Sequence, residues 1–190
     1  MRTHRIAVLA SASGSNAERL YEYFLHDTQI EISLVITNNP SAGVIQRCNR
    51  LKLDCHVLQN GQLTSEELNP LLKQYGITHV VLAGYLKLIP KWLIASFQDK
   101  IVNIHPALLP SYGGKGMYGM HVHESVVQNL ESFTGITIHL VSEEYDKGRI
   151  LLQKTIKITH PITSEQVAEH IHTLEYRYFP PLVEAWVQNS

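Results

Sequence analysis

The sequence has little of what marks several large classes of protein. Its 190 residues include 16 lysines and arginines against 17 aspartates and glutamates, so the net charge is −1. Because neither sign is in excess, no overall field would attract nucleic acid or an anionic membrane, and we expect neither as a partner. Any anion must therefore be held by local groups.

Long apolar runs and cysteines are also scarce. The chain opens with a short apolar run that reaches a Gly/Ser segment after residue 10, a pattern typical of neither a signal peptide nor a membrane-spanning helix. The two cysteines, Cys48 and Cys55, do not form a CxxC pair, and we interpret them as buried, reduced thiols. Together these absences favour a cytoplasmic protein.

What the sequence does contain is a regular alternation of two hydrophobic patterns. Runs rich in valine and isoleucine alternate with segments of helical spacing, which is the pattern of β-α-β units around a mostly parallel sheet in the α/β class. The length suits a single domain, residues 1–190. We expect strands at residues 5–10, 32–37, 55–58, 79–83, 101–104, 135–141 and 150–158. Helices are expected at residues 16–26, 43–51, from 64, 90–97, 122–130 and from 163, the last interrupted at Pro180 and Pro181.

A candidate phosphate site lies where the first expected strand meets the first helix, at Gly14, Ser15 and Asn16. Backbone N–H groups of a glycine turn, with the positive end of a helix dipole, bind a phosphate without lysine or arginine. The same residues also fit an ordinary tight turn and helix cap. They do not form the GxGxxG dinucleotide fingerprint.

A second candidate is the pair Asn103 and His105, at the carboxyl end of an expected strand. Residues two apart on a strand project to the same side, so an amide and an imidazolium could converge on one carbonyl oxygen. The alternative is a histidine that only satisfies a loop carbonyl. Asp146, at an expected turn, is either an ordinary turn residue or the charge that raises the pKa of His105.

Two further groups of residues have alternative interpretations. His121, His123 and His139 suggest a metal site, but they lack a recognisable zinc spacing, and we expect no metal. Residues 106–119 contain two prolines and four glycines and should form a loop, either a mobile lid or a surface segment. The aromatic and methionine side chains of that loop and its end are Tyr112, Met117, Tyr118 and the next residue after the loop, Met120.

Taken together, four segments resemble the folate-dependent glycinamide ribonucleotide formyltransferases of purine biosynthesis. The match covers nearly the whole chain in order and spacing. The segments are Gly14-Ser15-Asn16, residues 82–88 (Leu-Ala-Gly-Tyr-Leu-Lys-Leu), Asn103-Ile104-His105-Pro106 with residues 108–110, and Tyr145-Asp146-Lys147-Gly148.

The resemblance implies a doubly wound, mostly parallel sheet with a Rossmann-like half at about residues 1–100 and a catalytic and folate half at about 101–190. It implies transfer of the formyl group of 10-formyltetrahydrofolate to the amine of 5-phosphoribosylglycinamide. Asn103, His105 and Asp146 would be catalytic. The ribonucleotide would contact Gly14, Ser15, Asn16, His172 and Glu175. The folate would contact Leu86, Lys87, Leu88, Ile89, Asn103, Ser142, Glu143, Glu144 and Tyr145.

Some positions depart from the family pattern. Lys87 stands where arginine is expected, His172 where glutamine is usual, and Lys147 where a second glycine is common; residues 59–65 offer no clear basic contact for the folate tail. Two other functions stay open: a formyltransferase that acts on another amine, and a noncatalytic nucleotide-binding protein. The sequence is compatible with a monomer or a homodimer.

Overall fold

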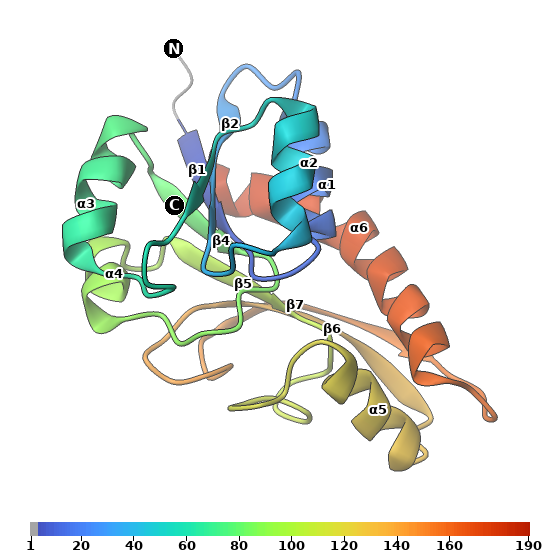
Figure 1. Ribbon diagram of the computed structural model, residues 1–190. Coiled ribbons are helices and arrows are strands. Elements are labelled where there is room, and N and C mark those ends of the chain that lie inside the picture. The colour runs from blue at the N-terminus through green and yellow to red at the C-terminus, as the bar shows by residue number, and fades with distance from the viewer. Residues whose placement is uncertain (1–3) are drawn as a thin grey trace.

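The computed structural model describes residues 4–190, so residues 1–3 of the expected domain lie outside the described part. A seven-stranded sheet, in the order β3-β2-β1-β4-β5-β6-β7, runs through the molecule (Figure 1). Its first five strands pair in parallel, and β6 and β7 are antiparallel. The strands are β1 (His4–Leu9), β2 (Ile30–Thr37), β3 (Cys55–Val57), β4 (His79–Leu82), β5 (Ile101–His105), β6 (Phe133–Leu140) and β7 (Ile150–Lys157).

Helices cover both faces of this sheet, so the predicted doubly wound α/β fold is confirmed (Figure 1). The helices are α1 (Ser15–Phe24), α2 (Gly43–Leu51), α3 (Ser65–Gln74), α4 (Lys91–Ser96), α5 (Met120–Gln128) and α6 (Ser164–Gln188). Residues 106–119 contain neither helix nor strand, as predicted. No helix within residues 4–190 is both long enough and apolar enough to cross a membrane.

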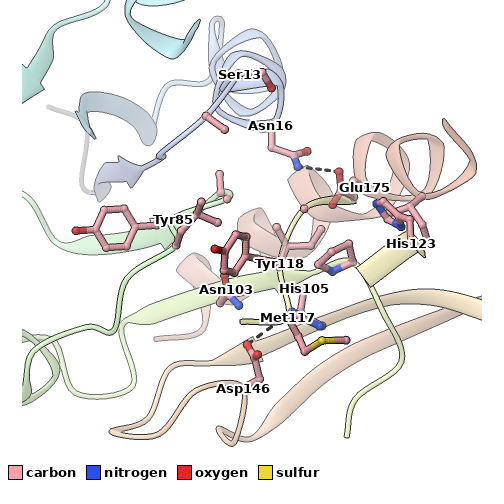
Figure 2. Close-up of a pocket in the computed structure, with 18 of the residues that line it drawn as sticks. Ser13, Asn16, Tyr85, Asn103, His105, Met117, Tyr118, His123, Asp146 and Glu175 are labelled. Carbon is pink, nitrogen blue, oxygen red and sulfur yellow. Dashed lines mark hydrogen bonds and ion pairs between the residues drawn. The ribbon is translucent and has the colours of Figure 1, made fainter. Parts of the chain in front are cut away.

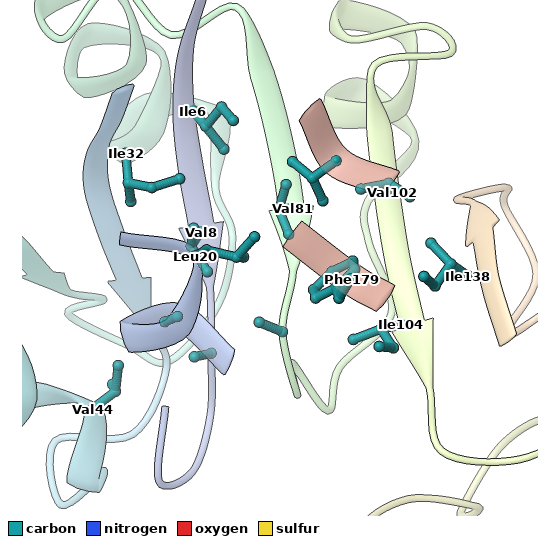
Figure 3. Close-up of a cluster of buried hydrophobic side chains, with 14 of the residues drawn as sticks. Ile6, Val8, Leu20, Ile32, Val44, Val81, Val102, Ile104, Ile138 and Phe179 are labelled. Atoms are coloured by element: carbon teal, nitrogen blue, oxygen red, sulfur yellow. The ribbon is translucent and has the colours of Figure 1, made fainter. Parts of the chain in front are cut away.

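Strand alternation divides the core into two layers. Along β1, Ile6 and Val8 face the layer that contains α1, α2 and α6, whereas Ala7 and Leu9 face the layer that contains α3 and α4. Figure 3 shows the first layer, where Ile6 and Val8 lie with Phe179 of α6 among fully buried side chains. Because both faces of the sheet are buried, the strand sequences are continuous apolar runs.

The predicted interruption of the last helix is wrong. Helix α6 continues through Pro180 and Pro181 to Gln188. Each proline removes a backbone donor and costs about 3 kcal/mol in a helix interior. Phe179, Val183 and Val187 are completely buried on the same helix, and burial of each stabilises the fold by about 1.5–3 kcal/mol. Packing of this size offsets the two prolines, a tertiary effect that local rules do not include.

Both cysteines are free thiols. Cys48 is buried as expected, but Cys55 on the short strand β3 is only half-buried.

Candidate active site

The site begins where β1 ends and α1 starts. Gly14 caps α1 with φ 75°, a left-handed conformation that glycine adopts without strain. A Cβ atom at this position would lie 2.3 Å from Cγ2 of Val44. Both the backbone conformation and the lack of space therefore disfavour any residue other than glycine. The first N–H groups of α1 have no partner within the helix and point out of its N-terminus. The local structure therefore leaves backbone donors open at Ser15 and Asn16.

A hydrogen-bond bridge holds this loop against the one that follows β4. The Ser11 hydroxyl donates to Oδ1 of Asn38 at 2.6 Å and accepts the N–H of Leu86 at 3.1 Å, while the N–H of Ser11 donates to the carbonyl of Gly84 at 3.0 Å. The carboxyl ends of β1 and β4 thus carry loops of fixed relative position. This edge of a doubly wound sheet is where ligands usually bind.

A cavity of about 500 Å³ opens between these loops, the end of β5, helix α6 and the loop at residues 114–119 (Figure 2). That volume is typical of a small-molecule site. Ten of the residues proposed from sequence line it: Gly14, Ser15, Asn16, Leu86, Asn103, His105, Tyr145, Asp146, His172 and Glu175.

A smaller hollow of about 50 Å³ adjoins the cavity and shares Tyr85, Asn103, Tyr145 and Asp146 with it. All but one of the remaining expected folate contacts line this hollow, namely Lys87, Leu88, Ile89, Ser142 and Glu144. Glu143 lines neither space, because its carboxylate pairs with Nζ of Lys91 at 2.6 Å on the surface. Lys87, the expected basic contact, donates from Nζ to the carbonyl of Gly61 at 2.8 Å.

His105 is almost fully buried, at 4% exposure, and both of its ring nitrogens face acceptors. Nε2 donates to the carbonyl of Tyr112 at 2.7 Å, and Nδ1 lies 3.7 Å from Oδ1 of Asp146. Burial lowers the pKa of His105, while Asp146 and the Tyr112 carbonyl raise it and offset only part of that effect. The expected direction was therefore wrong for His105 as a whole, although the contribution of Asp146 has the expected sign.

Asn103 is held from the neighbouring strand. Its Nδ2 lies 3.0 Å from Nε2 of His139, the residue opposite it in the β5–β6 ladder. His139 donates from Nδ1 to the carbonyl of Leu140 at 2.8 Å, so in the neutral ring Nε2 accepts from the Asn103 amide. One N–H of that amide is thereby fixed, and the other is free to point to a ligand.

The carboxylate of Asp146 lies close to both His105 and His139. Its Oδ1 lies 3.5 Å from Nε2 of His139 and 3.7 Å from Nδ1 of His105, and its Oδ2 accepts the N–H of Gly114 at 2.8 Å. Burial raises the pKa of Asp146, but nearby His139, the charge of His105 and the Gly114 N–H together lower it below the ordinary value. Asp146 is thus a carboxylate at neutral pH.

A second polar cluster lies at the other end of the cavity, where α1 meets α6. The buried carboxylate of Glu175 accepts from Nδ2 of Asn16 at 2.9 Å and contacts Nδ1 of His172, also at 2.9 Å (Figure 2). The hydrogen bond to Glu175 raises the pKa of His172, and partial burial opposes it. Both contacts use Oε2, which leaves Oε1 of Glu175 for a ligand.

Three site residues were missed or misread from sequence. His139 and His123 were considered only as metal ligands, yet His139 orients Asn103 and His123 lines the cavity, whereas His121 pairs with Glu124 on the surface. Tyr112 acts through its backbone carbonyl, which no side-chain pattern reveals. Of these three residues, only His139 could have been placed from the sequence, because the alternating pattern around it predicts a strand. Within residues 4–190 no three His, Cys, Asp or Glu side chains cluster as a metal site would require.

Comparison with known proteins identifies the family of this chain. The formyl transferase family matches residues 4–183. A chloroplastic phosphoribosylglycinamide formyltransferase of Arabidopsis thaliana is 36% identical over 192 residues, which cover 97% of this chain and 65% of that protein. The chain thus spans just under two thirds of the plant relative's length.

A bacterial relative is matched over nearly its full length. The phosphoribosylglycinamide formyltransferase of Bacillus subtilis is 30% identical over 186 residues, covering 95% of this chain and 93% of that protein. The crystal structure of the enzyme of that name from Anaplasma phagocytophilum superposes with a TM-score of 0.89 at 29% identity, covering 98% of this chain and 88% of that chain. This chain therefore belongs to the formyl transferase family, alongside relatives named phosphoribosylglycinamide formyltransferases.

Proposed function

We propose that this protein transfers the formyl group of 10-formyltetrahydrofolate to the amine of 5-phosphoribosylglycinamide, a step of purine biosynthesis. The observation that carries the proposal is the meeting of Asn103, His105 and Asp146 in one cavity that also contains the open N-terminus of α1. The relatives' names give the same reaction.

In this reaction negative charge develops on the formyl oxygen when the amine attacks. The free N–H of Asn103 and the imidazolium of His105 are the donors we assign to that oxygen. The 3.7 Å between Nδ1 of His105 and Asp146 exceeds hydrogen-bond length, so a protonated Nδ1 keeps its N–H for the oxyanion. Asp146 favours the charged ring by electrostatic attraction. Each such donor lowers a barrier by about 3–4 kcal/mol in other enzymes.

The ribonucleotide would occupy the end of the cavity formed by α1 and α6. We assign its phosphate to the backbone donors at Gly14, Ser15 and Asn16, because a helix N-terminus binds an anion without a cationic side chain. Glu175 would accept from polar hydrogens of the sugar or amine through its unused oxygen, with His172 beside it.

The folate would lie across the opening shared by the cavity and the smaller hollow. Leu86 and Leu88 are 37% and 45% exposed there, an apolar surface suited to a flat ring system. We retain Lys87, Ile89, Ser142, Glu144 and Tyr145 as folate contacts. Glu143 is the least favoured of the proposed set, since it points away. A cytoplasmic location and a monomer or homodimer stay predictions; the plant relative is named chloroplastic.

The deciding experiment supplies 10-formyltetrahydrofolate and 5-phosphoribosylglycinamide and follows the deformylated folate. We expect turnover that depends on both substrates. Exposed side chains with no hydrogen bond or ion pair within residues 4–190 provide matched controls, His26→Ala for His105→Ala and Asn49→Ala for Asn103→Ala. Turnover with a different amine would identify another formyltransferase, and folate binding without any turnover would identify a noncatalytic protein.

A further inference from the structure

His123 differs from the other histidines of the cavity. It is 4% exposed on the first turns of α5 and lines the cavity, yet its Nδ1 has no hydrogen-bond partner among residues 4–190. His105, His139 and His172 each use a ring nitrogen in a contact described above. An unpaired buried polar group costs about 1–3 kcal/mol, so it requires an explanation.

The position of His123 suggests that explanation. Helix α5 packs against α6, and Figure 2 shows the imidazole of His123 beside Glu175, in the cluster assigned to the ribonucleotide. The titratable groups that face it are Glu175, His172 and His105. His123 therefore lines the same cavity as the side chains assigned to the ribonucleotide and to the formyl oxygen.

The electrostatics keep the ring neutral. Burial lowers the pKa of His123, Glu175 opposes this, and His172 and His105 lower the pKa further. A neutral imidazole with uncommitted nitrogens carries a lone pair that can accept a proton near neutral pH. His105, in contrast, donates from Nε2 to the carbonyl of Tyr112, and its Nδ1 faces the Asp146 carboxylate at 3.7 Å, which suits a donor rather than an acceptor.

We propose that His123 is a catalytic residue that accepts the proton released by the attacking amine. This inference rests on the proposed function. The amine lone pair forms the new C–N bond while the formyl π electrons move onto oxygen. His123 then removes one N–H proton, and the electron pair of that bond stays on nitrogen. When the C=O bond re-forms, the bond to N10 of the folate breaks, N10 takes a proton from solvent, and His123 returns its own to solvent.

The test compares His123→Leu with His121→Ala, a histidine two residues away that is exposed and outside the cavity. Loss of a general base lowers kcat on the order of 100-fold, and we expect this for His123→Leu with the KM of the ribonucleotide changed only a few-fold. Thermal stability should stay equal or rise, because an unpaired nitrogen is removed. His121→Ala should behave as the unchanged protein.

A second variant separates catalysis from packing. In His123→Ala, added imidazole should raise turnover by about tenfold or more. The wild-type kcat should fall toward acid pH as the base is protonated, and this fall should be absent from His123→Leu. Wild-type kcat and the same pH profile in His123→Leu, or no rescue in a folded His123→Ala, would overturn the assignment. These outcomes presuppose an active wild type. An inactive wild type would instead reject the proposed function.

Discussion

Replacement of Gly14 by alanine tests the phosphate loop most directly, because two separate physical effects oppose it. The backbone at Gly14 has φ 75°, and the new Cβ would lie 2.5 Å from Cβ and 2.9 Å from Cα of Val44. Rotation of the Val44 side chain cannot move either of those atoms away. Gly84 provides the matched control, since it has φ 78° with nothing within 4 Å of an added Cβ.

The magnitudes follow from these distances. The left-handed conformation costs a non-glycine residue about 1–2 kcal/mol, which applies to both variants. Forcing an extra methyl into a packed site costs about 1–3 kcal/mol more, which applies only to Gly14→Ala. We expect losses of about 2–5 kcal/mol for Gly14→Ala and about 1–2 kcal/mol for Gly84→Ala. At about 2–4 °C per kcal/mol, Tm falls by roughly 4–20 °C and 2–8 °C.

Denaturant unfolding of the two variants and the wild type measures these losses. Gly14→Ala should also raise the KM of the ribonucleotide on the order of 10-fold or more, because a charge-assisted hydrogen bond to phosphate contributes about 1.5–3 kcal/mol. Equal stability of the two variants would refute the packing argument. An unchanged KM in Gly14→Ala would remove the phosphate from this loop.

Other side chains yield predictions with equally definite signs. His105→Ala and Asn103→Ala should each lower kcat on the order of 100-fold or more in steady-state assays, and wild-type kcat in both would refute the oxyanion role. Asp146→Asn should lower the pKa of His105, because the carboxylate that favours the charged ring is lost; an NMR titration without a shift would exclude this coupling. Burial lowers the pKa of His79 to about 4, so this group's contribution to stability is complete above its ordinary pKa near 6.5 and is lost as pH falls toward 4. His79→Leu should flatten that part of the unfolding profile, and an unaltered slope would contradict the argument.

The sheet and most of its elements could be predicted because local patterns determine them. Alternating runs at residues such as 5–10 and 101–104 identify strands, and spacing by two places Asn103 and His105 on one side of a strand. The proximity of His105 to Asp146 lies beyond this reasoning, since the distance between segments far apart in sequence depends on how the chain folds back after β6. Family resemblance, rather than spacing, pointed to that contact.

The errors have a common physical origin in burial and packing. The pKa of His105 moved opposite to expectation because its depth in the protein is a tertiary property. Pro180 and Pro181 break a helix by local rules, but the burial of Phe179 beside them decides the outcome. Glu143 was grouped with its neighbours, although successive loop residues point in different directions. His123 was considered from sequence only as a metal ligand, because an unpaired nitrogen is a property of the folded structure.

The reversal of chain direction at the edge of the sheet explains how the site is supported. Because β6 is antiparallel to β5, it places His139 opposite Asn103 and Thr137 opposite His105. His139 holds the Asn103 amide, while the Thr137 hydroxyl donates to the carbonyl of Ala107 at 2.7 Å and accepts the N–H of Leu109 at 3.0 Å.

Strand β6 thus supports both proposed oxyanion donors. It holds Asn103 through the His139 side chain, and it holds the segment that follows His105 through Thr137. A parallel strand at this place would need a long crossover connection, usually a helix, packed on a face of the sheet. The antiparallel pair instead connects β6 to β7 through residues 141–149, and this segment carries Asp146 back to His105 and His139. The proposed catalytic groups therefore depend on the two antiparallel strands, and the phosphate loop depends on the parallel ones.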